Sequence, residues 1–552
     1  MRSVPYAVAF RCHRAPRTLL KPTPDLLTDL RTRAAYSEGA GIYRIVPAAV
    51  AQPRDVEELQ RLVRWASETG TSLVPRGAGS GMVGGNVGRG VVVDLSAGFH
   101  GSTPDWANRK LWAGASVTWG EVTSAAHAVG LRVAPDPSSG AFATSGGMTA
   151  TNAAGPRSVR HGSVRRSIAA VDVVGADGEA RRVTRGGGGG SMGRFVLSAD
   201  HRRLIEARFP KTHKNSAGYA LDRFAESGDE LDLLIGSEGT LAFVTAVEWR
   251  LEPIPTDIAG AALGFTSLDA LADCIPYLVG LSPSAVELLD RTLLEIVRDS
   301  EAGATIGLPD GLEGLLLVEF ERETAAAARG AVGDAVRGVR SSAAHVATAV
   351  DRAGLEILWA IRRLASPALA RLSESRRSLQ VIEDGCVPLE RLSQYVAGIR
   401  AAAARRGIGV AIFGHAGDGH VHVNALPDVT AAGWRDALGA LYDDAVELLL
   451  RLQGTPSGEH GVGRLRAGVL ERFYGSAVMA LFRDLKRAYD PRGILNPGVI
   501  IPSADWAPLA DLKVGPDAAP IPGDVARRLR EVERTAGWAT PKVDLTTPAP
   551  RP

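Results

Sequence analysis

Cysteine is scarce in this sequence. Cys12, Cys274 and Cys386 lie far apart in the chain, and no CxxC pair occurs. This scarcity excludes a disulfide framework, an iron–sulfur cluster and a cysteine-rich zinc site. Any metal site must therefore use nitrogen and oxygen ligands.

Two further absences narrow the class of protein. Lys and Arg number 63 against 61 Asp and Glu, a net charge of +2, so the composition predicts no broad basic surface and no nucleic-acid partner. No run of about 18 uninterrupted apolar residues occurs, so no membrane-spanning helix is expected. We expect a cytoplasmic location, with peripheral attachment to a membrane as an option.

Changes of pattern divide the chain of 552 residues, 45% of them apolar, into four regions. We expect an N-terminal arm over residues 1–40, a first domain over 41–255, a second over 256–500 and a tail over 501–552. The prolines of EPIP, ending at Pro255, mark the central boundary. The arm is basic and lacks acids at its start, which favours a disordered segment and leaves a targeting peptide open. The tail is richer in proline and either wraps the domains or is partly disordered.

The first domain mixes helix and strand signals. Residues 55–70 have helical spacing, with Asp55 as N-cap and Gly70 as stop. A hairpin is expected from Ile168, turning at Asp177 and Gly178. Alternating apolar residues from Leu241 predict a half-buried strand. The glycine run over residues 186–190 is expected to be a flexible surface loop.

Two glycine-rich loops in this domain predict one large ligand. PRGAGSGMVGGN follows a strand but leads into another strand, GVVVDLS, so it lacks the helix that a Rossmann dinucleotide site requires. Its backbone N–H groups can still form an anion-binding nest, the alternative being a long hairpin loop. Residues 135–162 repeat the pattern of small residues, which favours an extended, flat ligand close to the backbone.

Histidines gather in GHAGDGHVHVN, residues 414–424. A strand would place His420, His422 and Asn424 on one face, and the preceding turn can bring His415 towards it. SGEHGVG, some 40 residues later, adds Glu459, and two histidines with one carboxylate form a common site for Zn²⁺, Mn²⁺ or Fe²⁺. The alternative is a solvated turn and edge strand.

Ordered motifs over roughly residues 40–500 resemble a known family. They are VPRGAGSGMVGGN, TSGGMTATNAAGP, KNSAGYAL, GSEGTLAFVTAVEWRLEPIP, LWAIRR, IEDGCVPLERL, GHAGDGHVHVN, SGEHGVG and DPRGILNPG. The sequence is similar to flavoproteins of the vanillyl-alcohol oxidase type, and among them to FAD-linked D-2-hydroxy acid dehydrogenases such as D-lactate dehydrogenase and the glycolate oxidase catalytic subunit. The resemblance implies an α+β fold, with an N-terminal FAD-binding domain and a C-terminal α+β cap domain.

The resemblance also implies a set of flavin contacts. They are Pro75, Arg76, Gly77, Ala78, Gly79, Ser80, Gly81, Met82, Gly146, Gly147, Thr151, Asn152, Gly155, Gly236, Glu238, Gly239 and Thr240. No histidine occurs in the first glycine loop, so FAD is expected to be non-covalent.

For the reacting centre, the resemblance implies a divalent metal on His415, His422 and Glu459, with His460 assisting removal of the hydroxyl proton. An unassisted alcohol is too weak an acid near pH 7, and a metal and a base together solve this difficulty. Arg362 matches the residue that binds the substrate carboxylate, although without the resemblance it would be taken for a surface helix residue. Ser366, one helical turn on, and Asn424 are candidate further contacts.

The expected reaction is oxidation of a D-2-hydroxy acid to the 2-oxo acid. A basic residue found in some members is absent at Val381 and Ile382, which favours a monocarboxylate such as D-lactate or glycolate over a diacid; Arg376 and Arg377 lie close enough in the chain to compensate. A separate acceptor, a quinone, a cytochrome or oxygen, would reoxidise the flavin, and the sequence leaves a homo-oligomer open. The alternatives are a flavin transferase like alkylglycerone-phosphate synthase and a catalytically silent flavin-binding protein.

Overall fold

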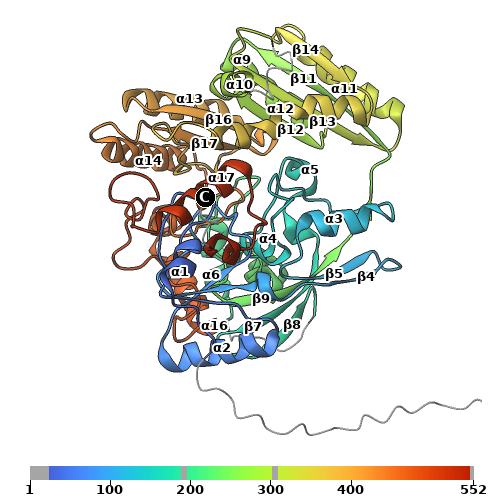
Figure 1. The fold of residues 1–552 in the computed structure, drawn as a ribbon. Helices are drawn as coiled ribbons and strands as arrows, with labels where there is room; N and C mark the ends of the chain where they lie inside the picture. Colours follow the sequence, from blue (N-terminus) through green and yellow to red (C-terminus); the bar gives the residue numbers. More distant parts are fainter. Residues whose placement is uncertain (1–23, 188–194, 301–308, 548–552) are drawn as a thin grey trace, which may run out of the picture.

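A computed structural model describes residues 24–187, 195–300 and 309–547. Figure 1 shows two stacked parts, a larger body below and a smaller cap above. The body contains a three-stranded parallel sheet and a five-stranded antiparallel sheet, and the cap contains a seven-stranded antiparallel sheet. The expected α+β architecture is confirmed.

The elements of the body are as follows. The parallel sheet has the order β1 (Ala49–Ala51), β3 (Val91–Asp94), β2 (Leu73–Arg76); the antiparallel sheet has the order β4 (Ser102–Asp105), β5 (Lys110–Gly114), β9 (Ala242–Arg250), β7 (Ile168–Gly175), β8 (Ala180–Thr184); β10 (Glu252–Pro253) pairs with β6 (Leu131–Arg132). The helices are α1 (Leu30–Ala35), α2 (Val56–Thr69), α3 (Trp119–His127), α4 (Ser145–Thr151), α5 (Ser158–His161), α6 (Ala199–Arg208), α7 (Leu221–Ser227), α8 (Glu230–Leu234), α15 (Leu470–Tyr474), α16 (Ser476–Tyr489) and α17 (Gly523–Thr535).

The elements of the cap follow between β10 and α15. Its sheet has the order β14 (His345–Ala349), β11 (Asp257–Phe265), β13 (Gly314–Arg322), β12 (Ala285–Asp290), β16 (Gly409–Gly414), β17 (His420–Leu426), β15 (Gly385–Cys386). Its helices are α9 (Leu268–Gly280), α10 (Arg291–Arg298), α11 (Ala325–Val339), α12 (Arg352–Ala370), α13 (Leu392–Arg405) and α14 (Trp434–Arg451).

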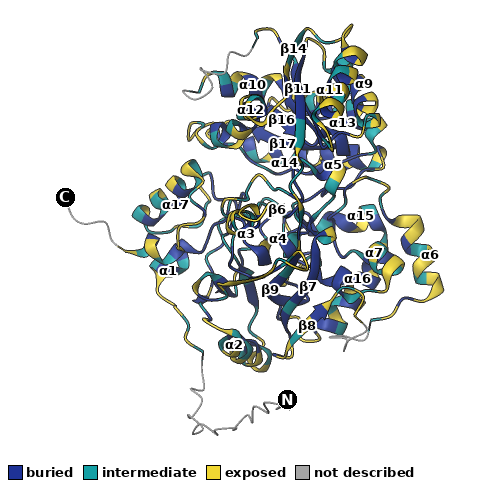
Figure 2. Ribbon diagram, turned by 90° about the vertical axis from the view of Figure 1, so that its right-hand side faces the viewer, coloured by how far each residue is buried: buried dark blue, intermediate teal, exposed yellow. Residues whose placement is uncertain are grey.

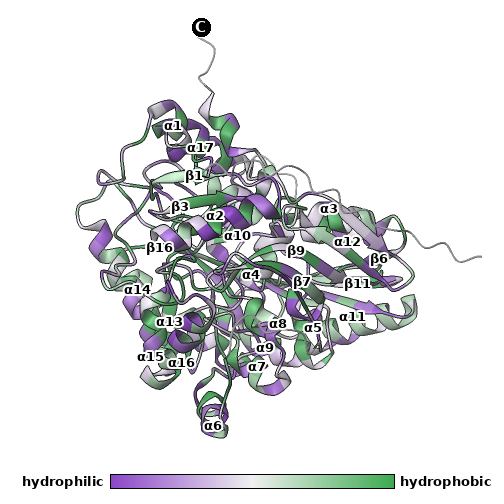
Figure 3. Ribbon diagram, turned by 90° about the horizontal axis from the view of Figure 1, so that it is seen from below, coloured by the Kyte–Doolittle hydropathy of each residue, from purple (hydrophilic) through white to green (hydrophobic). Residues whose placement is uncertain are grey.

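Local sequence signals account for the first elements of the body. Asp55 accepts a hydrogen bond from Glu58 N at the start of α2, and Gly70 ends the helix with φ 72°. The hairpin expected from Ile168 is confirmed as β7 and β8. Figure 2 shows α2 and α6 with exposed outer faces over buried strands, and Figure 3 shows the same contrast as hydropathy, with β9 largely hydrophobic.

The glycine-rich loop connects two parallel strands. Leu73 of β2 pairs with Val91 of β3 in parallel register, so the alternative of a hairpin loop is wrong. Parallel neighbours need a crossover connection, and this one passes over the end of the sheet as the open loop of residues 77–90.

β9 is buried on both faces, although its alternation predicted a half-buried strand. It lies between β5 and β7, and α4 packs against it. A bulge opposite Asp172 and Val173 changes the side on which its residues point. Phe243 therefore joins the core beneath α2, whereas Trp249 joins the core beneath α16.

The cap sheet is covered on both faces. α9, α11, α13 and α14 pack on one face, and α10 and α12 pack on the other. On β17, Val421 and Val423 belong to the first of these cores, while His422 and Asn424 point the other way, into a cavity. The expected alternation of polar and apolar residues along this strand is confirmed.

The chain returns to the body before residue 500. α16 was assigned by sequence to the second domain, but its Phe482 packs in the body core against Tyr219 and Phe209. Leu73 N of β2 also donates a hydrogen bond to Ile494 O. The apolar face of α16 completes the body, so a division at residue 500 does not match the packing.

The tail is folded against the start of the described chain. α17 and the 3-10 helix Lys542–Thr546 pack against α1, with Leu529 and Trp538 in a shared core with Tyr36. Figure 3 shows α1 and α17 next to each other. The part of the expected arm that is described is thus structured; residues 1–23, where a targeting peptide would lie, and residues 188–190 of the expected glycine loop fall outside the description.

None of the helices in the described part of the chain is both long and apolar enough to span a bilayer.

Candidate active site

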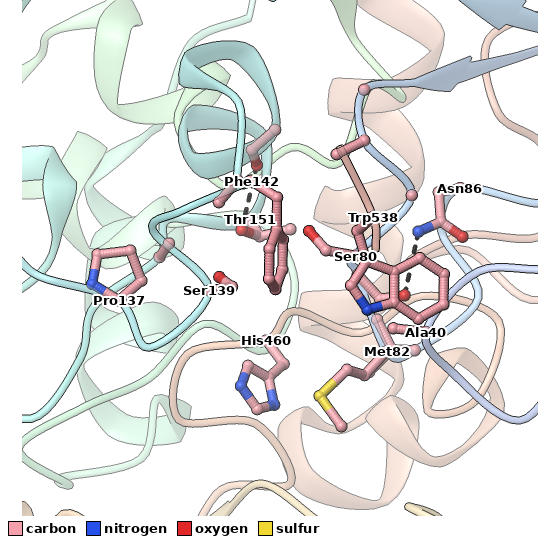
Figure 4. A pocket seen from close by; sticks show the side chains of 18 of the residues that line it. Ala40, Ser80, Met82, Asn86, Pro137, Ser139, Phe142, Thr151, His460 and Trp538 are labelled. Atoms are coloured by element: carbon pink, nitrogen blue, oxygen red, sulfur yellow. Dashed lines mark hydrogen bonds between the residues drawn. The ribbon is translucent and has the colours of Figure 1, made fainter. Parts of the chain in front are cut away.

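A cavity of about 520 Å³ lies between the body and the cap. Its wall comes from the glycine-rich loops, α4, α12, β17, the loop around His460 and the tail. Figure 4 looks into it: Phe142 and Trp538 face one another, Ser80 lies between them, and His460 lies below. Segments distant in sequence therefore meet around one space.

One side of the cavity is a cradle made mostly of backbone. All eight residues from Pro75 to Met82 line it, together with Gly146, Gly147, Thr151, Glu238 and Gly239. Gly79 has φ 82°, and a Cβ there would lie 2.4 Å from the Arg76 guanidinium. A Cβ on Gly146 would lie 2.8 Å from Ala115 Cβ. A smooth wall with accessible N–H groups fits an extended, phosphate-containing ligand such as FAD.

Arg76 supports this cradle from behind. Its buried guanidinium donates to Glu38 O at 2.7 Å and to Tyr36 O at 3.2 Å. These bonds fix the start of the glycine loop against α1.

Four of the residues expected to contact the cofactor do not line the cavity: Asn152, Gly155, Gly236 and Thr240. Asn152 ends α4 with φ 54°, and the Thr240 hydroxyl is bonded to Tyr219 at 2.7 Å. The structure places them behind the wall, where they shape its loops. Glu238 also has a structural bond: its carboxylate accepts from Val462 N at 2.7 Å and Gly463 N at 2.8 Å, which ties the cradle to the loop that carries His460.

Three atoms converge where the cap meets this wall. His415 Nε2 lies 2.8 Å from Glu459 Oε1, and His422 Nε2 lies 3.4 Å from both of these atoms. The turn Ala416–Asp418 between β16 and β17 brings His415 beside His422. All three side chains are buried.

The hydrogen bonds at Nδ1 of His415 and His422 determine whether Nε2 of each ring can bind a metal. His415 Nδ1 lies 2.6 Å from Glu287 Oε1, and His422 Nδ1 lies 3.0 Å from Glu383 O. Because both partners are acceptors, each Nδ1 carries a proton. Burial lowers the pKa of His422 to about 4, so its neutral ring turns a lone pair inwards at Nε2. Although burial alone would lower it, Glu287 and Glu459 raise the pKa of His415, whose Nε2 offers its lone pair once a cation displaces the inner proton. With Glu459, three electron-pair donors then face one another, which is the donor set of a metal with open positions.

The surrounding charges favour a cation at this point. In the network of buried contacts around the three atoms, the carboxylates are Glu287, Glu383, Asp384, Asp418 and Glu459, and the cations are Lys214, Arg362 and Arg466. The carboxylates exceed these cations by two, and protons on His415 and His460, whose pKa values the same carboxylates raise against the effect of burial, balance that excess; a divalent cation bound here could replace those protons. Burial alone would raise the pKa of Glu459, but His415 and Lys214 outweigh it and hold that pKa well below its ordinary value.

His460 lines the cavity beside this group. Its ring stacks on that of His422, with centroids 4.9 Å apart, and its Nδ1 lies 2.5 Å from Glu383 Oε2. Burial alone would lower the pKa of His460, but Glu383 and Asp384 raise it to about 10. Asp384 also holds the loop, because it accepts from His460 N at 2.9 Å and from Ser457 Oγ at 2.6 Å. Nε2 is thus the nitrogen left to meet a substrate.

Arg362 is buried and not a surface residue. Its Nε donates to Glu287 Oε2 at 2.8 Å, and its guanidinium lies 4.8 Å from the centre of the Phe413 ring. Ser366 lines the cavity one turn further along α12. Asn424 lines it from β17 and accepts from Ser378 Oγ at 3.0 Å.

Sequence reasoning missed several members of this site. Glu287, which joins His415 to Arg362, could have been noticed as a lone carboxylate within the apolar strand AVELLD. Glu383 and Asp384 lie in the recognised motif IEDGCVPLERL, but no role was inferred for them. Lys214, whose Nζ lies 2.7 Å from Glu459 Oε2, begins the recognised motif KNSAGYAL, but no role was inferred for it because the two residues are distant in sequence.

Comparison with known sequences identifies the parts of the chain. The family described as "FAD binding domain" matches residues 47–184, and "FAD linked oxidases, C-terminal domain" matches residues 254–500. The glycolate oxidase subunit GlcD of Bacillus subtilis is 30% identical over 471 residues, which cover 84% of this chain and 92% of that protein. This chain belongs to the FAD-linked oxidases. It binds FAD and is an oxidoreductase of the type to which D-lactate, glycolate and D-2-hydroxyglutarate dehydrogenases belong.

Two further relatives of this FAD-linked oxidase differ in length. D-lactate dehydrogenase of Archaeoglobus fulgidus is 30% identical over 455 residues, which cover 82% of this chain and 91% of that protein. D-2-hydroxyglutarate dehydrogenase of Escherichia coli is 29% identical over 519 residues, which cover 87% of this chain but only 50% of that protein, so the chain spans about half of its length.

Solved structures support the fold of this FAD-linked oxidase. A 4-ethylphenol oxidase from Gulosibacter chungangensis aligns with TM-score 0.62 at 16% identity and covers 87% of this chain and 94% of that one. An alkyldihydroxyacetonephosphate synthase aligns with TM-score 0.60 at 16% identity, covering 86% and 83%. At this identity the likeness shows the fold alone, and it is the fold expected from the sequence.

Proposed function

We propose that this FAD-linked oxidase converts a D-2-hydroxy acid to the 2-oxo acid, with a divalent cation, Zn²⁺, Mn²⁺ or Fe²⁺, held by His415, His422 and Glu459. The observation that carries the proposal is the convergence of three electron-pair donors next to a buried arginine, in the cavity that also contains the glycine cradle. The relatives named for D-lactate, glycolate and D-2-hydroxyglutarate support this substrate class.

Arg362 binds the carboxylate of the substrate. Among the described residues, Glu287 engages its Nε, which leaves the two terminal nitrogens for a bidentate contact. A charge-assisted bond of this kind contributes roughly 1.5–3 kcal/mol. Ser366 and Asn424 border the same space and complete the contacts to the acid.

His460 accepts the hydroxyl proton at Nε2. Glu383 holds the ring by its Nδ1 and stabilises the imidazolium that results, which is why the pKa of His460 is high. The cation supplies positive charge that stabilises the developing alkoxide and favours the neutral form of His460 before the reaction. FAD supplies the hydride acceptor, which no protein side chain offers.

A separate acceptor, a quinone, a cytochrome or oxygen, then takes the electrons. The scarcity of cysteine leaves no iron–sulfur centre within this chain to receive them.

Anaerobic bleaching of the flavin tests the proposal. D- and L-2-hydroxy acids are added singly to the yellow protein, before and after treatment with a chelator. We expect a D-acid to bleach the flavin absorption, its L-enantiomer to fail, and the chelated protein to recover on addition of Zn²⁺ or Mn²⁺. A flavoprotein that no 2-hydroxy acid bleaches in either form would overturn the proposed reaction, and bleaching that survives complete metal removal would overturn the role of the cation.

A further inference from the structure

The C-terminal tail contributes charged side chains to the wall of the cavity. Arg530 and Arg534 of α17 line it together with Arg377, which precedes β15. The family match ends at residue 500, so α17 lies outside the matched residues. The tail therefore adds to the cavity something that the family pattern did not predict.

Positive charge is in excess in this group, which we name the tail cluster. Its cations are Arg377, Arg530, Arg534 and Lys513, and its carboxylates are Glu374 and Glu533. Arg377 lies 2.9 Å from each carboxylate, and Arg530 lies 2.8 Å from Glu374 and 3.4 Å from Glu533. Two carboxylates are thus shared by four cations.

Two of the arginines that carry this excess positive charge are largely buried. The side chains of Arg377 and Arg530 are only 10% and 15% exposed. Several positive charges in a partly buried cavity wall are unfavourable unless an anion binds beside them. Although burial alone would raise it, the cations hold the pKa of Glu533 below its ordinary value, which shows the sign of the local potential.

The three arginines of the tail cluster line the same cavity as the reacting centre at Arg362 and His422. Arg362, Ser366 and Ala370 line the cavity at four-residue spacing on one face of α12, which places Ala370 about 12 Å along the helix axis from Arg362. Ser378, next to Arg377, donates a hydrogen bond to Asn424 of β17, two residues from His422. An acid held by Arg362 would therefore extend towards these arginines.

We propose that the substrate is a 2-hydroxy acid with a second anionic group, and that Arg377, Arg530 and Arg534 bind that group. The inference rests on the proposed function, whose substrate it narrows. The sequence favoured a monocarboxylate because Val381 and Ile382 carry no charge. The structure supplies the missing cations from Arg377 and from a helix about 150 residues later in the chain, with Arg377 to Glu533 separated by 156 positions.

Matched pairs of acids measure the second subsite directly. D-malate, D-2-hydroxyglutarate and D-2-hydroxyadipate are compared with D-2-hydroxybutyrate, D-2-hydroxyvalerate and D-2-hydroxyhexanoate, which have the same chain lengths and a methyl group in place of the second carboxylate. We expect at least one diacid to exceed its partner tenfold or more in kcat/KM. Equal values in all three pairs would overturn the inference.

Substitutions then locate the subsite. R530Q removes one cation, and we expect the ratio of diacid to monoacid kcat/KM to fall tenfold or more. R527Q is the matched control, because Arg527 is an exposed arginine of the same helix that does not line the cavity. A ratio that R530Q leaves unchanged, or that R527Q lowers equally, would refute the assignment.

A variant that is expected to increase the preference for diacids separates a specific effect from a loss of folding. E374Q removes a carboxylate whose side chain is 58% exposed and which competes for the arginines. We expect the diacid to monoacid ratio to rise about threefold or more, a result that loss of structure cannot produce. An unchanged or lower ratio would contradict the inference.

Two other results point elsewhere. If R530Q loses bound flavin while the ratio stays unchanged, the cluster neutralises the FAD pyrophosphate and the inference is wrong. Perturbation of the flavin spectrum by glutarate and by valerate, which lack the reacting hydroxyl, tests the subsite without turnover; glutarate should bind at least tenfold more tightly. Failure of every hydroxy acid to bleach the flavin would instead defeat the proposed function itself.

Discussion

The two sides of the cavity are built from different materials. The cradle of the body is mostly backbone, with glycines where a Cβ would strike a neighbour, and its buried Arg76 is bonded to the carbonyl groups of Tyr36 and Glu38. The centre in the cap is made of buried charged side chains, each held by another. A backbone wall is sensitive to added volume, whereas a charged centre is sensitive to a single lost charge. Substitutions on the two sides should therefore fail in different ways.

The largest effect is expected at Glu459, where charge and position both matter. E459Q keeps the shape but removes a ligand charge, so bound metal should be lost and kcat/KM should fall about 10³-fold, since a metal contributes several kcal/mol. Metal analysis and steady-state kinetics measure both, with E447Q as control because Glu447 is 54% exposed on α14. Retention of metal and full turnover in E459Q would show that the centre is misassigned.

Arg362 should come next. R362A removes one partner of a buried pair and leaves Glu287 uncompensated, so we expect kcat/KM to fall about 10²-fold, from a loss of 2–5 kcal/mol in such pairs. Arg363, its neighbour on α12, is 53% exposed and provides the control R363A. If KM and kcat of R362A match those of the unaltered protein, the substrate carboxylate is held elsewhere.

A substitution at Glu287 tests whether the hydrogen bond that holds His415 contributes to metal binding. E287Q removes the carboxylate that fixes the Nδ1 proton of His415, and metal affinity should fall by roughly 10- to 100-fold. Glu295 is 50% exposed on α10, so E295Q controls for the change of residue type. Metal titration monitors the change, and an affinity within twofold of the unaltered protein would argue against this support.

The smallest effect is expected in the cradle. G79A places a Cβ at φ 82° and against Arg76, which costs about 1–2 kcal/mol, so FAD should bind roughly tenfold more weakly and excess FAD should restore activity. G330A in α11 is the control, because nothing lies within 4 Å of a Cβ there. Undiminished flavin affinity in G79A would mean that the loop adapts and that the contrast between the two sides is weaker than described.

Local sequence patterns predict much of the fold and part of the candidate site. The capped helix α2, the hairpin of β7 and β8, and the alternation on β17 all depend on neighbours within a few residues, and all were predicted. The three candidate metal ligands also follow from two short motifs, and the structure places their atoms together.

The predictions that failed concern residues whose burial or pairing depends on partners distant in the sequence. Arg362 looks like a surface residue until Glu287, 75 positions away, is seen beside it. β9 is buried on both faces because its Phe243 packs in the core of α2 and its Trp249 in the core shared by α4 and α16, and its own alternation gives no sign of these helices. The tail cluster combines residues near 375 with residues near 530, a pairing that no local window contains.

The body has one further property, and it concerns synthesis of the protein. Its core contains α16, whose Phe482 and Leu485 pack with residues from before Pro255, so more than two hundred residues of cap separate the two halves of one core. During translation the first half must wait, with apolar strands uncovered, until the cap has emerged from the ribosome and the second half follows. A body cut at residue 255 would lack one wall permanently. The cap is in this sense an insertion, and the FAD-binding part of the enzyme is complete only when nearly the whole chain has been made.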